Sequence, residues 1–375
     1  MEETLSVLPM KQLYRIDPIW IINNGSTLLK SNRDLSTYLS LCAPNRLKNW
    51  GLVDRTQTFK MPLNFQIRLP IKKISSVIQT YSDACNTRAK EIINLAELND
   101  LKIYILWSGG VDSTAVLTSL LLNSSEDQQK RFVILLTQSS IKENLNYFNN
   151  FILGKLKYET AITYRTLLKS GHIIVNGECQ DQLYMLFGDR LYTDDEIQVQ
   201  ATPDTFTKTF LEKPTFEKKL VEDYMYLAYQ SAKSVGVELK EIWEYIWWIL
   251  FCFVLQANDV RNFMFVDDPF DPELISQNII TFYSSSKFDQ WAMQRVQNHK
   301  DLPPINKFYK KESKEYIFAF DKNKEYFDKK EKVNSGGVLQ NTYQKKPIMD
   351  NLMKNVPVEF LMDYYNPDNF FSKYR

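Results

Sequence analysis

The chain has 375 residues, of which 44% are hydrophobic and 24% charged, and these proportions exclude a largely disordered protein. Its 46 Lys and Arg residues balance 45 Asp and Glu residues, so the net charge of +1 gives no support to a polyanion-binding protein. The isolated cysteines and two histidines are too scattered for a zinc or iron–sulfur site, and they favour a reducing, cytoplasmic compartment.

Residues 1–72 are predicted to form a small strand-rich region, to which the sequence assigns no role. Turn residues at 23–25 follow a short apolar stretch at 18–22, and residues 65–69 alternate like a half-buried strand. The acidic first residues lack the basic and then apolar segments of a secretory signal, so none is expected.

Alternating helices and strands are predicted over residues 75–175. A helix is expected over 75–98, where Val77, Tyr81 and Cys85 begin an apolar pattern at helical spacing. It is followed by a buried strand at 101–107, a tight turn at 108–113, a short apolar helix at 114–123, a strand at 131–136, a helix at 142–155 and a strand at 172–175. This order predicts an α/β fold with a doubly wound, mostly parallel sheet.

Polar loops follow the first and third of these strands, at residues 108–113 and 176–182. Ligands of doubly wound sheets bind outside the carboxyl ends of the strands. The two loops are therefore the predicted site, whereas His172, at the start of the third strand, is predicted to be a structural residue.

The rest of the chain is predicted to be mostly helical. Residues 215–257 are rich in aromatic side chains, and residues 302–332 are rich in lysine. The apolar run at 246–255 is shorter than the ~20 residues of a membrane span, so we expect a buried helix and no membrane association. The spacing of Trp243, Trp247 and Trp248 favours core packing over a ligand platform.

The turn at 108–113 has the composition of a phosphate-binding loop. Gly109 and Gly110 permit a sharp turn and a close approach of the backbone to a ligand. The start of the following helix offers N–H groups and a positive dipole end to an anion. Asp112 would repel a phosphate unless a divalent cation lay between them, so the loop predicts both a nucleotide and Mg²⁺.

This turn, Ser-Gly-Gly-Val-Asp-Ser, resembles the SGGxDS signature of the PP-loop ATP pyrophosphatases. Those enzymes cleave ATP between the α and β phosphates and leave AMP on a substrate oxygen. The loop at 176–182, Asn-Gly-Glu-Cys-Gln-Asp-Gln, resembles the SGEGSDE loop of asparagine and β-lactam synthetases, although Asn176, Cys179 and Gln182 depart from it. Weaker likenesses to asparagine synthetases lie at 261–271, 309–317 and 330–332, so the resemblance covers about residues 75–340.

The resemblance implies a PP-loop, HUP-like architecture and a set of site residues. Asp112 and Asp181 would hold Mg²⁺, and Glu178 would orient the attacking amine or take its proton. Lys332 or Lys330 would stabilise the negative charge that develops during adenylation, with Lys314 and Lys311 as alternates. The triphosphate or pyrophosphate of ATP would be held by Ser108, Gly109, Gly110, Val111, Asp112, Ser113 and Thr114.

The implied function is that of an AMP-forming ligase that joins a small acceptor carboxylate to an amine or ammonia. Glu2 stands where glutamine-using relatives carry a catalytic cysteine, so a glutaminase domain is not expected, and the nitrogen would come from ammonia, an amine or a partner protein. Two alternatives stay open: modification of a nucleic-acid base, and ATP binding without catalysis. Cys179 is a nucleophile or, more simply, a small loop residue. The expected domains are residues 1–72, 73–340 and a tail at 341–375.

Overall fold

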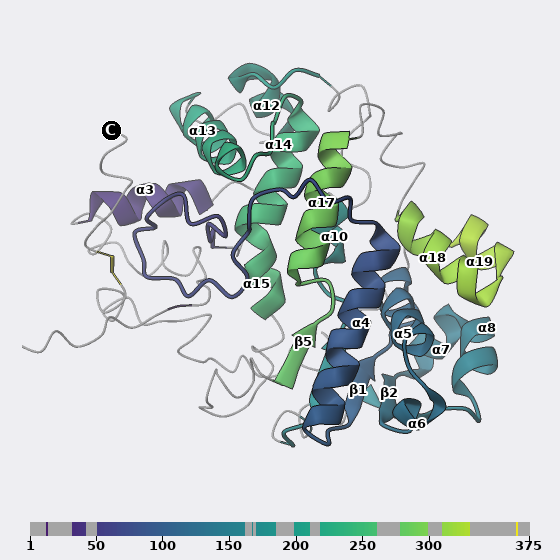
Figure 1. The fold of residues 1–375 in the computed structure, drawn as a ribbon. Helices are drawn as coiled ribbons and strands as arrows, with labels where there is room; N and C mark the ends of the chain where they lie inside the picture. The colour runs from purple at the N-terminus through teal and green to yellow at the C-terminus, as the bar shows by residue number, and fades with distance from the viewer. Residues whose placement is uncertain are drawn as a thin grey trace, which may run out of the picture. The chain divides into compact units, whose positions relative to one another are not determined.

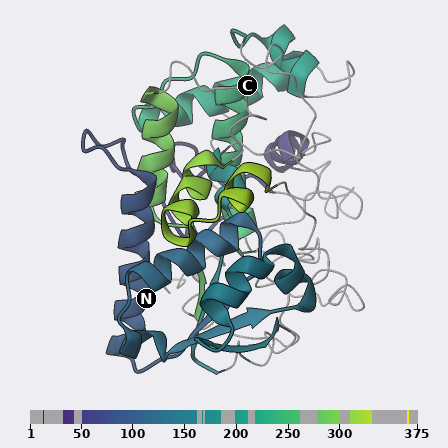
Figure 2. The same ribbon diagram turned by 90° about the vertical axis from the view of Figure 1, so that its right-hand side faces the viewer.

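The computed structural model describes residues 13, 32–42, 51–161, 167, 170–184, 199–210, 218–260, 278–298, 310–330 and 365–366. The chain divides into two compact units (Figures 1 and 2). The first comprises residues 1–72, 195–260 and 349–375, and the second comprises residues 73–194 and 261–348. The expected domain at 73–340 is thus interrupted, because residues 195–260 pack with the N-terminal segment instead.

A five-stranded parallel sheet forms the centre of the second unit. Its order is β3-β2-β1-β4-β5, and each neighbouring pair runs parallel. The strands are β1 (Ile103–Leu106), β2 (Phe132–Leu136), β3 (Lys157–Thr160), β4 (Ile173–Asn176) and β5 (Ile279–Thr281). The predicted α/β class and parallel sheet are therefore confirmed. Strand order reverses between β1 and β4, where such sheets bind their ligands.

Three helices lie side by side in this unit (Figure 1). They are α17 (Ser286–Asn298), α4 (Tyr81–Leu98) and α5 (Val111–Leu122), and α4 contacts both of the others. α5 is apolar nearly all round, and it also packs against α18 (Lys311–Asp321), which is followed by α19 (Lys324–Lys329). The shorter elements are α6 (Glu126–Gln129), α7 (Gln138–Glu143), α8 (Leu145–Tyr147), the π-helix η1 (Phe148–Ile152) and α10 (Gln180–Tyr184).

The predicted boundaries differ from the observed ones at α4. This helix begins at Tyr81, after the cap residue Thr80, whose side chain accepts a hydrogen bond from the Asp83 amide. Residues 75–79 form no helix and include a bend at 76–77, and the Val77 side chain, part of the predicted helical pattern, is exposed. Gln294 of α17 instead accepts from the Gln79 amide and donates to the Val77 carbonyl, so this segment follows α17 before the helix starts.

The described part of the first unit is mainly helical. Its helices are α3 (Arg33–Cys42), α12 (Pro203–Phe210), α13 (Lys218–Ser234), α14 (Ile242–Trp248), the π-helix η4 (Ile249–Val254) and α15 (Leu255–Asp259). Trp243, Trp247 and Trp248 are buried, as predicted, and so is the whole apolar run at 246–255. Among the described residues, no helix is long and apolar enough to cross a membrane.

Backbone contacts with η4 hold residues 51–72 in this unit. The Val53 and Arg55 amides donate to the carbonyls of Phe253 and Cys252, and the Arg55 guanidinium donates to the Phe251 carbonyl. These contacts replace regular strand pairing. The strand predicted at 65–69 is therefore wrong, and Phe65 makes only an isolated bridge with Leu13.

Candidate active site

The first polar loop joins β1 to α5 and presents the start of that helix. Gly110 is the N-cap residue of α5, and no side chain caps the helix there. Ser113 Oγ lies 3.0 Å from Ser108 Oγ and accepts from the Ser108 amide at 3.0 Å, which holds the turn closed. An uncapped first helical turn with hydroxyl groups beside it is a favourable site for an anion.

Two glycines are required by the close packing around the loop. Gly109 has φ +80°, and a Cβ there would overlap the backbone oxygen of Ser140. A Cβ at Gly177, in the second loop, would lie 3.1 Å from the Ser113 amide nitrogen. The second loop therefore lies directly against the start of α5, which joins the two predicted loops into one site.

The second loop begins where β4 ends. Asn176 is buried, and its side chain accepts from the Glu178 amide at 2.9 Å. Cys179 is buried with φ +73°, in a place where the resembled loop has glycine. These features agree with the simpler prediction, that Cys179 is a small buried residue of the loop. Asp181 lies in the first turn of the short helix α10 that follows.

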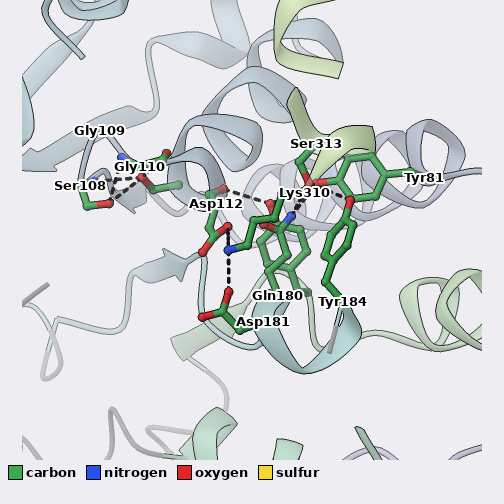
Figure 3. A network of polar contacts seen from close by, with 12 residues as sticks. Tyr81, Ser108, Gly109, Gly110, Asp112, Gln180, Asp181, Tyr184, Lys310 and Ser313 are labelled. Carbon is green, nitrogen blue, oxygen red and sulfur yellow. Dashed lines mark hydrogen bonds and ion pairs between the residues drawn. The ribbon is translucent and has the colours of Figure 1, made fainter. Parts of the chain in front are cut away.

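Asp112 and Asp181 share one cation, the ammonium group of Lys310 (Figure 3). Lys310 Nζ lies 2.6 Å from Asp181 Oδ1 and also contacts Asp112 Oδ1. The Lys310 side chain is only 1% exposed, whereas each aspartate is 31% exposed. The carboxylates thus face an accessible space, and the lysine reaches them from the protein side.

The electrostatics of Asp112 reflect this crowding. Partial burial raises the pKa of Asp112 to about 6, against the opposing effect of Lys310. The neighbouring carboxylates of Asp181 and Glu178 raise this pKa further. Asp112 and Asp181 together carry more negative charge than the single ammonium of Lys310 neutralises, so the site favours an additional cation.

A second buried ion pair lies behind the glycine turn. Lys330 Nζ is 2.6 Å from Glu143 Oε1, and their side chains are 8% and 4% exposed. Glu143 touches the turn, since its Oε1 would lie 3.5 Å from a Cβ at Gly110. Tyr326, four residues before Lys330, donates to the Gly109 carbonyl at 3.2 Å. α19 and the residue after it are thereby tied to the phosphate loop.

The structure brings most of the predicted site residues together. Asp112, Asp181 and Glu178 meet at the junction of the two loops, and Lys330 lies beside the glycine turn. Thr114 is buried and accepts from the Trp107 indole at 3.2 Å, so its hydroxyl is part of the core beneath the loop. Lys314 donates to the Lys330 carbonyl and Lys311 pairs with Glu315. Lys332 lies outside the described residues, as do residues 261–271.

Sequence reasoning missed Lys310, Glu143 and Gln180. Lys310 lies one residue before Lys311 and four before Lys314, the two alternates, and nothing local distinguishes it from them. Its left-handed backbone, φ +48°, is a property of the folded chain. Glu143 ends a short helix with no motif around it, so only the tertiary structure identifies it.

Comparison with known proteins gives no family assignment: no protein-family model matches this chain, and no curated protein is significantly similar to it.

Proposed function

We propose that this protein is an ATP-dependent, AMP-forming ligase that joins an acceptor carboxylate to an amine or ammonia. The observation that carries the proposal is the meeting of Asp112 and Asp181 on one buried ammonium, beside a glycine turn at the switch point of a parallel sheet. Phosphate groups and a divalent cation would find suitable partners there, beside the fixed positive charge of Lys310.

The residues fit Mg²⁺ as the second partner of ATP. Among the described residues, no group of three or more His, Cys, Asp or Glu side chains forms a metal cage. Mg²⁺ does not need one, because it is commonly held by one or two carboxylates together with phosphate oxygens and water. Asp112 and Asp181 would hold the ion, which supplies positive charge against the phosphate oxygens when bound.

The glycine turn and the first turn of α5 would bind the β and γ phosphates through backbone N–H groups and the Ser108 and Ser113 hydroxyls. Lys330 would add a positive charge to the same side of the loop, with Glu143 fixing its position. This arrangement would hold the pyrophosphate part of ATP, with the α phosphate toward Asp112, Asp181 and Lys310.

The first half-reaction is adenylation. An oxygen of the acceptor carboxylate attacks the α phosphorus, the bond from that phosphorus to the bridging oxygen breaks, and pyrophosphate leaves with the bond's electron pair. Lys310 would stabilise the charge that grows on the α-phosphate oxygens, whereas the same role for Lys332, which lies outside the described residues, stays a prediction. Positioning and electrostatics account for most of such a step.

In the second half-reaction the amine nitrogen attacks the acyl carbon and AMP departs. The attacking nitrogen must lose a proton, and Glu178, which is half-buried in the second loop, would accept it. A Glu178→Gln protein should keep ATP–pyrophosphate exchange, which reports adenylation, and lose amide formation. Equal loss of both would contradict this role.

Acceptor-dependent release of pyrophosphate from ATP is the test. A panel of small carboxylic acids with ammonia is expected to stimulate release, and Asp112→Asn should lower it at least about 100-fold, equivalent to ~2.7 kcal/mol of transition-state stabilisation. The matched control is Asp127→Asn, which removes an exposed acid of the same unit that pairs with Lys130. Stimulation by RNA or DNA instead of acids, or ATP binding with no pyrophosphate from any acceptor, would refute the proposal.

A further inference from the structure

A buried polar network lies on the protein side of Lys310 (Figure 3). At its centre, Gln180 Nε2 donates to Ser313 Oγ at 2.8 Å and to the Tyr81 hydroxyl at 2.7 Å. The Tyr184 hydroxyl lies 3.0 Å from Ser313 Oγ. All four side chains are buried, and they come from the second polar loop and its helix α10, from α4 and from α18.

The network continues to the phosphate loop. The Tyr81 hydroxyl lies 3.3 Å from the hydroxyl of Tyr283, which donates to the Asp112 carbonyl at 3.0 Å. One chain of polar contacts therefore joins the backbone of Asp112 to Gln180, which directly precedes Asp181 in the sequence, and to the first turn of α18.

Lys310 depends on that first turn for its position. It is the N-cap residue of α18, has φ +48°, and accepts the first helical hydrogen bond from the Lys314 amide at 2.9 Å. A left-handed conformation costs an ordinary side chain about 1–2 kcal/mol and persists only where the surroundings impose it. Gln180 and Tyr184 hydrogen-bond to Ser313 in the first turn of α18, and through Ser313 they hold the turn that carries Lys310.

Core stability alone does not explain a glutamine here. Gln180 is fully buried and bonded to Tyr81, whose ring packs against Tyr184 and Tyr316. The Gln180 Oε1 has no hydrogen-bond partner in the part of the chain that the structure describes. A buried amide with an unpaired oxygen is costly, and an apolar side chain of similar size would avoid that cost. Such imperfect groups tend to be kept where function needs them.

We infer that Gln180 is a positioning residue, which holds Ser313 and the first turn of α18 so that the Lys310 ammonium lies between Asp112 and Asp181. The inference rests on the proposed function for its catalytic consequence, but the placement of Lys310 can be measured without any turnover. Gln180 and Ser313 act through Lys310 and touch no reacting atom.

The direct measurement is the rate at which Lys310 reacts with a water-soluble acylating ester. Chymotrypsin cleavage after Tyr309 and Tyr316 gives a peptide of residues 310–316 that carries Lys310, Lys311 and Lys314 together. Fragment ions then report each lysine separately, with the half-exposed Lys311 as the internal reference. In the wild-type protein Lys310 should react far more slowly than Lys311, because it is buried and doubly ion-paired.

The variants are Gln180→Leu and Ser313→Ala, with Ser313→Thr as the conservative variant that keeps the hydroxyl. Both disruptive variants should raise the relative labelling of Lys310 at least about tenfold, a change equivalent to ~1.4 kcal/mol in the free energy of opening. Ser313→Thr should restore slow labelling. In the pyrophosphate assay, kcat should fall by a similar factor while KM for ATP stays unchanged, since the glycine turn is intact.

Tyr147→Phe is the matched control for Tyr184→Phe. Like Tyr184→Phe, it removes a buried tyrosine hydroxyl that is hydrogen-bonded to another hydroxyl, in this case that of Thr118 at 2.8 Å. This hydroxyl is not part of the network around Ser313. Tyr184→Phe should increase Lys310 labelling, and Tyr147→Phe should not.

Unchanged Lys310 labelling in folded Ser313→Ala protein would overturn the inference. If Gln180→Leu fails to fold, the smaller Ser313→Ala change decides the question. If labelling rises as expected but the wild-type protein releases no pyrophosphate, the positioning inference stands and the proposed function falls. If pyrophosphate is released and labelling does not change, the reverse holds.

Discussion

A methyl group added at Gly109 should destabilise the second unit more than one added at Gly154. Both glycines have left-handed φ angles, +80° and +73°, so an alanine at either position carries the same backbone penalty of about 1–2 kcal/mol. The two differ in their surroundings. A Cβ at Gly109 overlaps the Ser140 carbonyl oxygen, whereas a Cβ at Gly154 meets nothing within 4 Å.

The overlap at Gly109 cannot be relieved by a side-chain rotation, because the oxygen belongs to the backbone of α7. Overpacking of this kind typically costs a further ~1–3 kcal/mol. Gly109→Ala should therefore lower the free energy of unfolding by about 2–5 kcal/mol in total, and Gly154→Ala by about 1–2 kcal/mol. Gly109→Ala should also lose pyrophosphate release even when folded, since the turn must shift away from Ser140.

Urea denaturation followed by fluorescence of the buried tryptophans measures both values, with Gly110→Ala as a third variant. A Cβ at Gly110 meets only the ends of two side chains, Ser108 Oγ at 3.2 Å and Glu143 Oε1 at 3.5 Å. These side chains can move, so this variant should be the mildest of the three. Equal losses for Gly109→Ala and Gly154→Ala would refute the packing of the glycine turn against α7.

Three further predictions concern charges and thiols. Lys310→Met should raise the affinity for Mn²⁺ in the absence of nucleotide at least about tenfold (~1.4 kcal/mol), because an ammonium no longer neutralises Asp112 and Asp181. Electron paramagnetic resonance of free Mn²⁺ measures this affinity, and Lys314→Met is the control. An unchanged affinity would contradict the shared-cation geometry. Lys330→Met should lower the free energy of unfolding, measured in urea, by about 3–5 kcal/mol, because it leaves the buried Glu143 without its partner. A second change, Glu143→Leu, should recover much of this loss. No recovery in the double variant would argue against the ion pair. Burial raises the pKa of the Cys42 and Cys85 thiols to about 12, so both stay protonated as the pH rises from about 7 to 9. Neither thiol should therefore react with Ellman's reagent until the protein is unfolded. Rapid labelling of either thiol in the native protein would show that the thiol is not buried.

Those parts of the fold that depend on local pattern were predictable. β1 and β2 are short, continuously apolar runs, and β4 is apolar up to its last residue, Asn176; a parallel strand covered on both faces needs that composition. β3 was not predicted, because Lys157–Thr160 lies at the edge of the sheet with all four residues exposed and shows no apolar pattern. β5, with three residues, is too short to give a periodic signal.

The candidate site likewise has one part that could be predicted from the sequence and one that could not. The glycine turn and the two aspartates were visible because a backbone turn and a carboxylate pair need particular residue types at particular places. Lys310 meets Asp112 across 198 positions, and Lys330 meets Glu143 across 187, so no local rule selects these lysines from the many in the chain. Nothing in the sequence singles out Gln180, and its bonds to Tyr81 and Ser313 are made by folding.

The interleaving of the two units has a consequence for biosynthesis. Arg55 donates to the Phe251 carbonyl, 196 positions further along the chain, and both residues belong to the unit that opens with the N-terminal segment. At ~5–20 residues per second, a ribosome needs roughly 10–40 s to make that stretch. During this interval the whole of residues 73–194 is synthesised while the Arg55 segment waits for its acceptor. Nascent chains stalled before residue 250 should therefore expose residues 51–72 to proteases and to holding chaperones.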